Sequence, residues 1–106
     1  MIPPTAIEVL SEARKLLERG WTQCTYARDL DGNGVEPRDR NAVAWCIRGA
    51  LCKARDRWFG DQAERRLQQM VGGAGLITNW NDTAKRTQAE VLALLDQAIA
   101  AEGGAP

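Results

Sequence analysis

The sequence predicts a mainly α-helical protein, a compact four-helix domain with a central buried helix and a short strand and turn between helices one and two. Apolar residues recur at spacings of three and four in four segments, and helix-capping pairs precede three of these segments. A chain of 106 residues has room for one core. We therefore expect a single helical domain over 1–106, with frayed ends at 1–4 and 103–106.

The first helix is predicted by its cap and by its apolar spacing. Thr5 and Glu8 match a capping box, in which each side chain accepts a hydrogen bond from the backbone of the other residue. Gly20 supplies a stop signal. The apolar residues between these signals are Ile7, Leu10, Ala13 and Leu17.

The segment after the first helix changes character. Residues 22–28 are rich in Thr, Tyr and Cys, and the run Asp31-Gly32-Asn33-Gly34 is a strong turn signal. We expect a short strand and a tight turn here, with a small β-hairpin closed by Val35 as one form of it.

The second helix is predicted from about Asn41 to Trp58, after the start signals Pro37 and Asp39. Its apolar residues fall on two opposite sides of a helical wheel. One side holds Val43, Ile47, Ala50, Leu51, Ala54 and Trp58, and the other holds Ala42, Trp45, Gly49 and Cys52. A helix that is apolar on two sides packs on both, so we expect the remaining helices to surround it.

Two further helices are predicted by the same kind of signal. Asp61 and Glu64 precede a helix that ends at Gly72-Gly73, and Thr87 and Glu90 precede a helix that ends near Glu102. Between them, Asp82 is a residue type that caps a single helical turn.

Charge and composition limit the classes of function. The 14 basic and 14 acidic residues cancel, so no overall field favours nucleic acid or an anionic membrane. The chain has neither the apolar run of about 20 residues that a bilayer crossing needs nor a secretory signal at 1–4. We expect a cytoplasmic protein.

The counts of cysteine and histidine favour neither metal binding nor catalysis. Cys24, Cys46 and Cys52 are odd in number, and histidine is absent, so zinc sites and disulfide frameworks are not expected. Without histidine the commonest general base is missing. We expect buried thiols, no cofactor and no metal, and we rank an enzyme based on a cysteine or a carboxylate below a binding protein.

The run from Asp29 to Val35 resembles the first half of a calcium-binding EF-hand loop. The second half does not fit, because Arg40 stands where a bidentate glutamate completes the calcium shell. Asp, Asn and Gly are also the residues that a tight turn requires. The sequence therefore predicts a turn and no specific calcium site.

Two groups of residues are candidates for a binding site. Trp45 and Arg48 put an aromatic ring beside a guanidinium, which suits a phosphate, a carboxylate or a nucleobase, and the alternative is a buried tryptophan beneath arginine side chains. Trp80-Asn81-Asp82 puts a ring next to an amide and a carboxylate, which suits a polar ligand. Its alternative is a buried tryptophan followed by a helix cap.

Several short motifs, taken in order, resemble those of a family of small uncharacterised bacterial proteins, a domain of unknown function. They are Gly20-Trp21, Ala27-Arg28-Asp29, the W-C-x-x-G-A-L run from Trp45 to Leu51, Trp80-Asn81-Asp82, and Arg86-Thr87. The resemblance spans nearly the whole chain. It implies a shared fold, no activity, and motif residues that lie together in space. We therefore expect a ligand-binding site formed by Trp21, Arg28, Trp45, Arg48, Trp80, Asn81 and Asp82.

Three functional hypotheses follow, in order. The first is a non-catalytic module that binds a small polar or anionic, nucleotide-like ligand through tryptophan and arginine. The second is a protein-interaction or homo-oligomerisation module anchored by an exposed tryptophan. The third is a small enzyme that uses a cysteine or a carboxylate.

Overall fold

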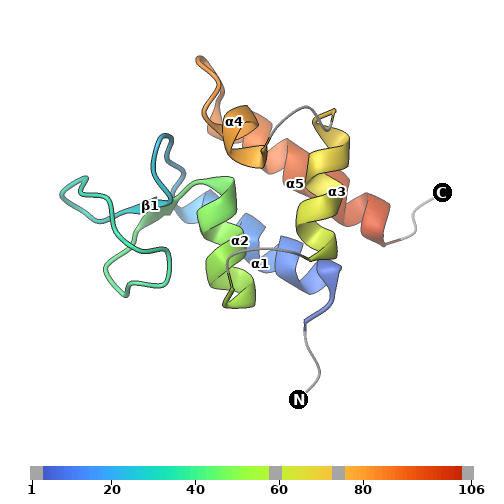
Figure 1. Ribbon diagram of the computed structural model, residues 1–106, viewed down its shortest axis with the longest axis horizontal. Helices are drawn as coiled ribbons and strands as arrows, with labels where there is room; N and C mark the ends of the chain where they lie inside the picture. Colours follow the sequence, from blue (N-terminus) through green and yellow to red (C-terminus); the bar gives the residue numbers. More distant parts are fainter. Residues whose placement is uncertain (1–3, 58–60, 73–75, 104–106) are drawn as a thin grey trace.

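The computed structural model describes residues 4–57, 61–72 and 76–103, and these ranges contain five helices and a two-stranded antiparallel sheet (Figure 1). The domain is mainly helical, and the small sheet lies between the first two helices, as predicted. The helix count is one higher than the four predicted. Trp58 and most of the predicted frayed ends lie outside the described residues.

The predicted caps are confirmed. Helix α1 (Ala6–Arg19) begins at Thr5 and α5 (Gln88–Glu102) begins at Thr87, each with both hydrogen bonds of a capping box. Helix α3 (Gln62–Met70) begins at Asp61, whose side chain accepts from the Glu64 N–H. These ends were predictable because their caps are local.

Helix α1, rather than α2 (Ile47–Arg55), makes the most extensive contacts with the other helices. It packs mainly against α5 and α2 and also against α3. Helix α2 is buried on nearly every side from Ile47 to Cys52, as the two apolar sides predicted, but its helix partners are mainly α1 and α4 (Ile77–Asn81). The other faces of α2 are covered by the segment that contains the two strands. The periodicity of apolar residues in α2 does not identify that segment as a neighbour. The prediction that the other helices surround α2 is wrong for α5, whose main partners are α1 and α3.

The sheet pairs β1 (Ala27–Arg28) with β2 (Ala44–Trp45), with Ala27 opposite Trp45. A bridge between Arg28 and Gly34 and a hydrogen bond from the Val35 N–H to the Ala27 carbonyl, 3.0 Å, close the predicted turn. We call residues 20–46 the excursion, which projects at one end of the molecule (Figure 1).

The predicted start of helix two at Asn41 is wrong. The helix begins at Ile47, because Val43, Trp45 and Cys46 donate their backbone N–H groups to carbonyls of residues 20–28 instead of to a helix. Trp45 is therefore a strand residue and only 1% exposed. Long-range pairing overrode the helical preference of this segment.

The fifth helix, α4, is the single turn expected near Asp82, but it precedes Asp82 instead of following it. Asp82 is its C-terminal cap residue. Helix α4 lies against α2 and α3. No helix in the described ranges is long and apolar enough to cross a bilayer.

Candidate functional site

The Asn81 side chain joins three separate segments of the chain. It is 0% exposed, and its Oδ1 accepts from the Trp21 indole Nε1 at 2.9 Å and from the Ile47 backbone N at 3.0 Å. Its Nδ2 donates to the Thr22 carbonyl at 3.1 Å and to Asp82 Oδ1 at 2.9 Å. Both lone pairs of the oxygen and both amide hydrogens are used, so the side chain has one possible orientation.

Asp82 extends this connection to the next residues of the excursion. Its Oδ1 also accepts from the Cys24 backbone N at 2.9 Å, and Cys24 has a left-handed backbone with φ of 67°. The Gln23 amide donates to the carbonyls of Asn81 and Thr83, both at 3.0 Å. We call residues 21–24 and 80–83 together the corner.

A hollow of about 280 Å³ lies beside the corner. We call it the corner hollow. Among the described residues, it is lined by Cys24, Thr25, Tyr26, Cys46, Thr78 and Asp82. Asp82 is the one acidic residue of this group, which contains no lysine or arginine. The hollow is open, since Tyr26 is 45% exposed.

Cys46 stands at the N-terminus of α2, where a thiolate would be favoured, but the thiol stays protonated. Its Sγ accepts from the Gly49 N–H at 3.3 Å and caps the helix. Burial raises the pKa of Cys46, and the negative charge of Asp82 adds to the rise, against the lowering by the backbone N–H groups of Gly49 and Arg48. A neutral thiol is a poor nucleophile, so the site does not favour cysteine catalysis.

Gly49 explains how the excursion approaches α2 so closely. A Cβ at this position would collide with the Tyr26 carbonyl oxygen, and the glycine is buried. The backbones of α2 and the segment before β1 are therefore in direct contact. Tyr26 is positioned at the hollow by this contact and by its carbonyl, which accepts from the Cys46 N–H at 3.1 Å.

Arg28, a predicted ligand-binding residue, stabilises the excursion internally. Its guanidinium donates to Thr22 Oγ1 at 2.8 Å, to the Gly32 carbonyl at 2.9 Å and to the Gln23 carbonyl at 3.2 Å. It therefore links the predicted turn to the corner without lining the corner hollow.

Arg48 points to α3 and away from the corner. It is 2% exposed and forms a two-bond ion pair with Glu64, at 3.1 and 3.2 Å. The neighbouring Arg55 bonds to Glu64 at 2.8 Å and to Asp61 at 2.6 Å. Two arginines and two carboxylates thus hold α2 to α3, and we call them the α2–α3 ion cluster.

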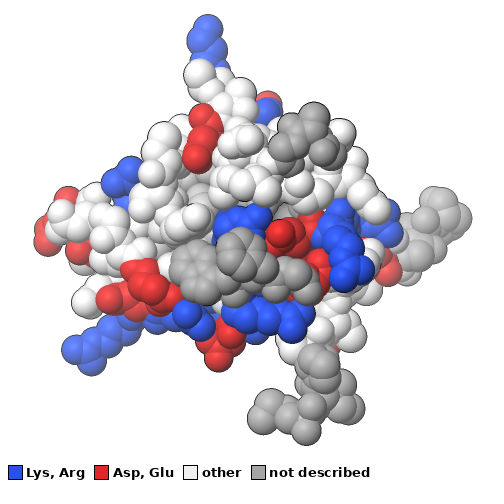
Figure 2. All heavy atoms as spheres, in the orientation of Figure 1, with Lys and Arg blue, Asp and Glu red and all other residues white. Residues whose placement is uncertain are grey.

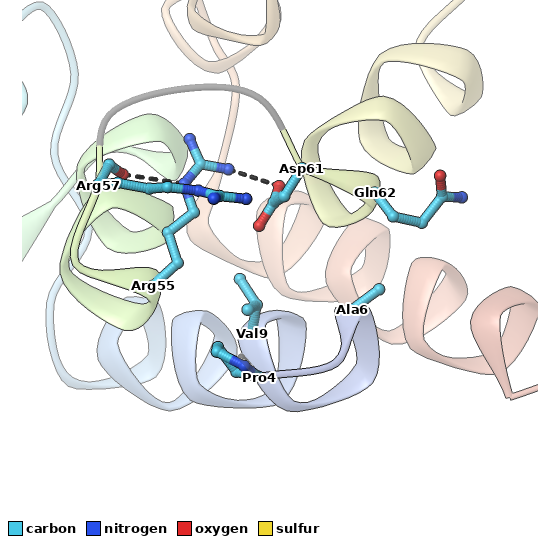
Figure 3. Close-up of a pocket in the computed structure, with 7 residues that line it drawn as sticks. All are labelled: Pro4, Ala6, Val9, Arg55, Arg57, Asp61 and Gln62. Atoms are coloured by element: carbon cyan, nitrogen blue, oxygen red, sulfur yellow. Dashed lines mark hydrogen bonds and ion pairs between the residues drawn. The ribbon is translucent and has the colours of Figure 1, made fainter. Parts of the chain in front are cut away.

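A second hollow, of about 160 Å³, lies beside this cluster. Figure 3 shows Arg55 reaching from α2 to Asp61 at the start of α3, above an apolar floor at the start of α1. Its described lining is Pro4, Ala6, Val9, Arg55, Arg57, Asp61 and Gln62. The buried Arg55 already bonds to Asp61 and Glu64. The residues around this hollow therefore serve to pack the helices together.

The described tryptophans lie in three different settings. Trp45 is core, and its Nε1 donates to the Pro37 carbonyl at 3.0 Å. Trp21 is half-buried and bonded to Asn81. Trp80 is also half-buried, and the Arg86 guanidinium lies 3.8 Å from its ring centre.

The structure therefore brings together only part of the predicted site. Trp21, Asn81 and Asp82 meet at the corner, and Trp45 lies beside Trp21 through a β-bridge. Arg28 contacts the corner through Thr22 and Gln23, whereas Arg48 bonds to α3 and Trp80 stacks on Arg86. Sequence reasoning missed the lining residues Thr25, Tyr26 and Thr78, which carry no motif signal of their own.

The predicted turn is confirmed. Asp29 Oδ1 accepts from the backbone N–H groups of Asp31 and Asn33, at 3.0 and 2.9 Å, and Gly32 has a φ of 83°. The described residues contain no cluster of three or more acidic, cysteine or histidine side chains placed to bind a metal. The absence of a calcium site stays a prediction.

The surface charges are mixed. On the face that Figure 2 shows, basic and acidic side chains lie next to one another across the lower half of the molecule.

A model of a family of unknown function, DUF6197, matches residues 1–101. The chain belongs to this family. DUF6197 membership agrees with the resemblance found in the sequence and implies no activity.

No curated protein and no solved structure is significantly similar to this DUF6197 member.

Proposed function

We propose that the chain is a non-catalytic binding module that holds a small polar ligand in the corner hollow. The observation that carries this proposal is the lining, which brings two threonines, a tyrosine and one aspartate together around a hollow beside a fixed corner. Ligand sites combine such a shape with a few positioned polar groups. The volume of about 280 Å³ suits a ligand smaller than a typical drug.

Rigidity of the wall supports this proposal. Asn81 uses all four of its hydrogen-bonding positions, and these bonds hold Trp21, Thr22 and Asp82 in place. A wall that is ordered before binding loses little entropy when the ligand arrives. The protonated thiol of Cys46 supports binding over catalysis.

The same lining shifts the ligand chemistry away from anions at this hollow. Arg28 and Arg48, the residues that the sequence suggested for an anion, bond to backbone carbonyls and to Glu64 respectively. An anion in the hollow would instead meet the carboxylate of Asp82.

The test is a titration by two-dimensional amide NMR with nucleotides, polyols, amino compounds and small carboxylates. We expect at least one compound to shift the amides of residues 24–26 and 78–82 in a saturable way. Thr78→Val removes a hydroxyl from the lining while keeping its shape, and it should weaken that compound. Asn79→Ala, on an exposed position of the same helix outside the lining, should not. A folded protein that shows no saturable shift in this region with any class would refute the proposal.

A second candidate is homo-oligomerisation, and an exposed leucine favours it. Leu30 is 88% exposed at the tip of the turn that Asp29 holds rigid, so the apolar side chain is presented in an ordered loop. It replaces the exposed tryptophan of the sequence hypothesis as the anchor. Light scattering at rising concentration should show an oligomer that Leu30→Ser disrupts and Leu76→Ser, at a position 58% exposed, does not. A monomeric mass throughout would exclude this candidate.

A further inference from the structure

We propose that the ligand of the corner hollow carries a protonated amine, which binds Oδ2 of Asp82. This inference deepens the proposed function and depends on it.

The carboxylate of Asp82 is fixed but not neutralised. Its Oδ1 accepts from the Cys24 backbone N and from Asn81 Nδ2, both at 2.9 Å, and both donors are uncharged. Among the described residues, neither an ion pair of Asp82 nor a hydrogen bond to its Oδ2 is found. Oδ2 is thus an available carboxylate acceptor on a residue that lines the hollow. Bonds between charged donors and carboxylates are about twice as strong as neutral ones.

The surroundings favour a cation over an anion. The described lining contains no lysine or arginine, and Cys46 contributes a neutral thiol. Arg48 is the arginine that acts on Cys46, and Glu64 already holds it through two bonds. An anion would meet the charge of Asp82 with little local compensation, whereas an ammonium group would be attracted by it.

The remaining lining suits an ammonium group better than a metal ion. A metal site needs several anionic or carbonyl ligands, and Asp82 is the one carboxylate in the described lining. An ammonium group has three N–H donors, and Thr78, a residue type with a hydroxyl acceptor, is among the lining residues. Tyr26 also lines the hollow, and an aromatic ring is a favourable neighbour for a cation.

The experiment compares three four-carbon probes that differ mainly in their end groups: 1,4-diaminobutane, 1,4-butanediol and succinate. Amide NMR titration of the full chain should show that the diamine shifts residues 24–26 and 78–82 and binds about two- to fivefold more tightly than the diol, as expected for an ion pair with an exposed carboxylate. Asp82→Asn should remove this preference, because the asparagine Oδ1 still accepts from Cys24 but the charge is gone. Asp31→Asn makes the same charge change outside the lining and should leave the preference intact.

A second measurement needs no variant. Raising the salt concentration should weaken the diamine and leave the diol unchanged, since only the charged ligand is screened. A preference for the diol or succinate, or a diamine affinity that neither salt nor Asp82→Asn changes, would overturn the inference while the proposed function stands. If none of the three probes shifts these amides but another class in the wider panel does, the amine assignment alone is refuted. If no compound in either experiment shifts them, both are refuted.

Discussion

Replacing Asn81 with alanine should destabilise the protein more than any comparable change of an exposed polar residue. The substitution removes the partner of three groups: the Trp21 indole N–H, the Ile47 backbone N–H and the Thr22 carbonyl. Asp82 keeps its bond from Cys24. An unsatisfied buried polar group costs about 1–3 kcal/mol of the free energy of unfolding. Water can reach the more exposed of these three groups, so we expect a total loss of about 3–5 kcal/mol, in the lower part of the summed range. That is a large share of the roughly 5–15 kcal/mol typical of small proteins.

Urea unfolding followed by tryptophan fluorescence measures this loss, with Asn79→Ala as the control on an exposed position of the same helix. We expect Asn81→Ala to lower Tm by at least about 12 °C, using about 4–8 °C per kcal/mol for a small domain. In amide NMR spectra, the indole N–H signal of Trp21 should also move toward the position of a solvent-exposed indole. A loss below about 1 kcal/mol relative to the control would mean that these hydrogen bonds do not hold the corner together.

Three other predictions concern the packing and the turn. Gly49→Ala should destabilise by about 2 kcal/mol or more in thermal melts, because its Cβ collides with the Tyr26 carbonyl, and a neutral result would show that the two backbones separate easily. Glu64→Gln should destabilise the protein by about 3 kcal/mol, because it leaves two buried arginines with one carboxylate fewer. Urea unfolding measures this loss, and an unchanged midpoint would contradict a buried ion cluster. Calcium titration should give no saturable amide shifts at residues 29–34 below about 1 mM, and saturation there would show that the turn is a calcium loop.

Helix ends were predictable where the signal was local. The capping boxes at Thr5 and Thr87 place both cap partners within four residues, so the sequence alone defines them. The start of α2 was not predictable in this way. Its cap is the Cys46 thiol together with Asn81, a residue 34 positions further along the chain. Proline and aspartate before residue 41 were therefore misread as the helix start.

The candidate site was predictable only as a list of residue types. The motif Trp80-Asn81-Asp82 contributes to the corner, but the asparagine, rather than the tryptophan, is its fully buried member. No periodicity identifies such a residue, because its burial depends on donors from distant segments. Arg48 was placed at the site by helical geometry from a wrong helix start, and the true neighbour, Glu64, could be found only once α3 was positioned.

The bonds of Asn81 also bear on how the chain folds during synthesis. The excursion and the start of α2 are complete by residue 47, but their shared polar partner emerges from the ribosome more than 30 residues later. Until then, the Ile47 N–H and the Trp21 indole have only water as a partner. A nascent chain that ends before α4 should therefore hold its sheet loosely, and the segment becomes protected from proteases only once residue 82 has been released from the exit tunnel.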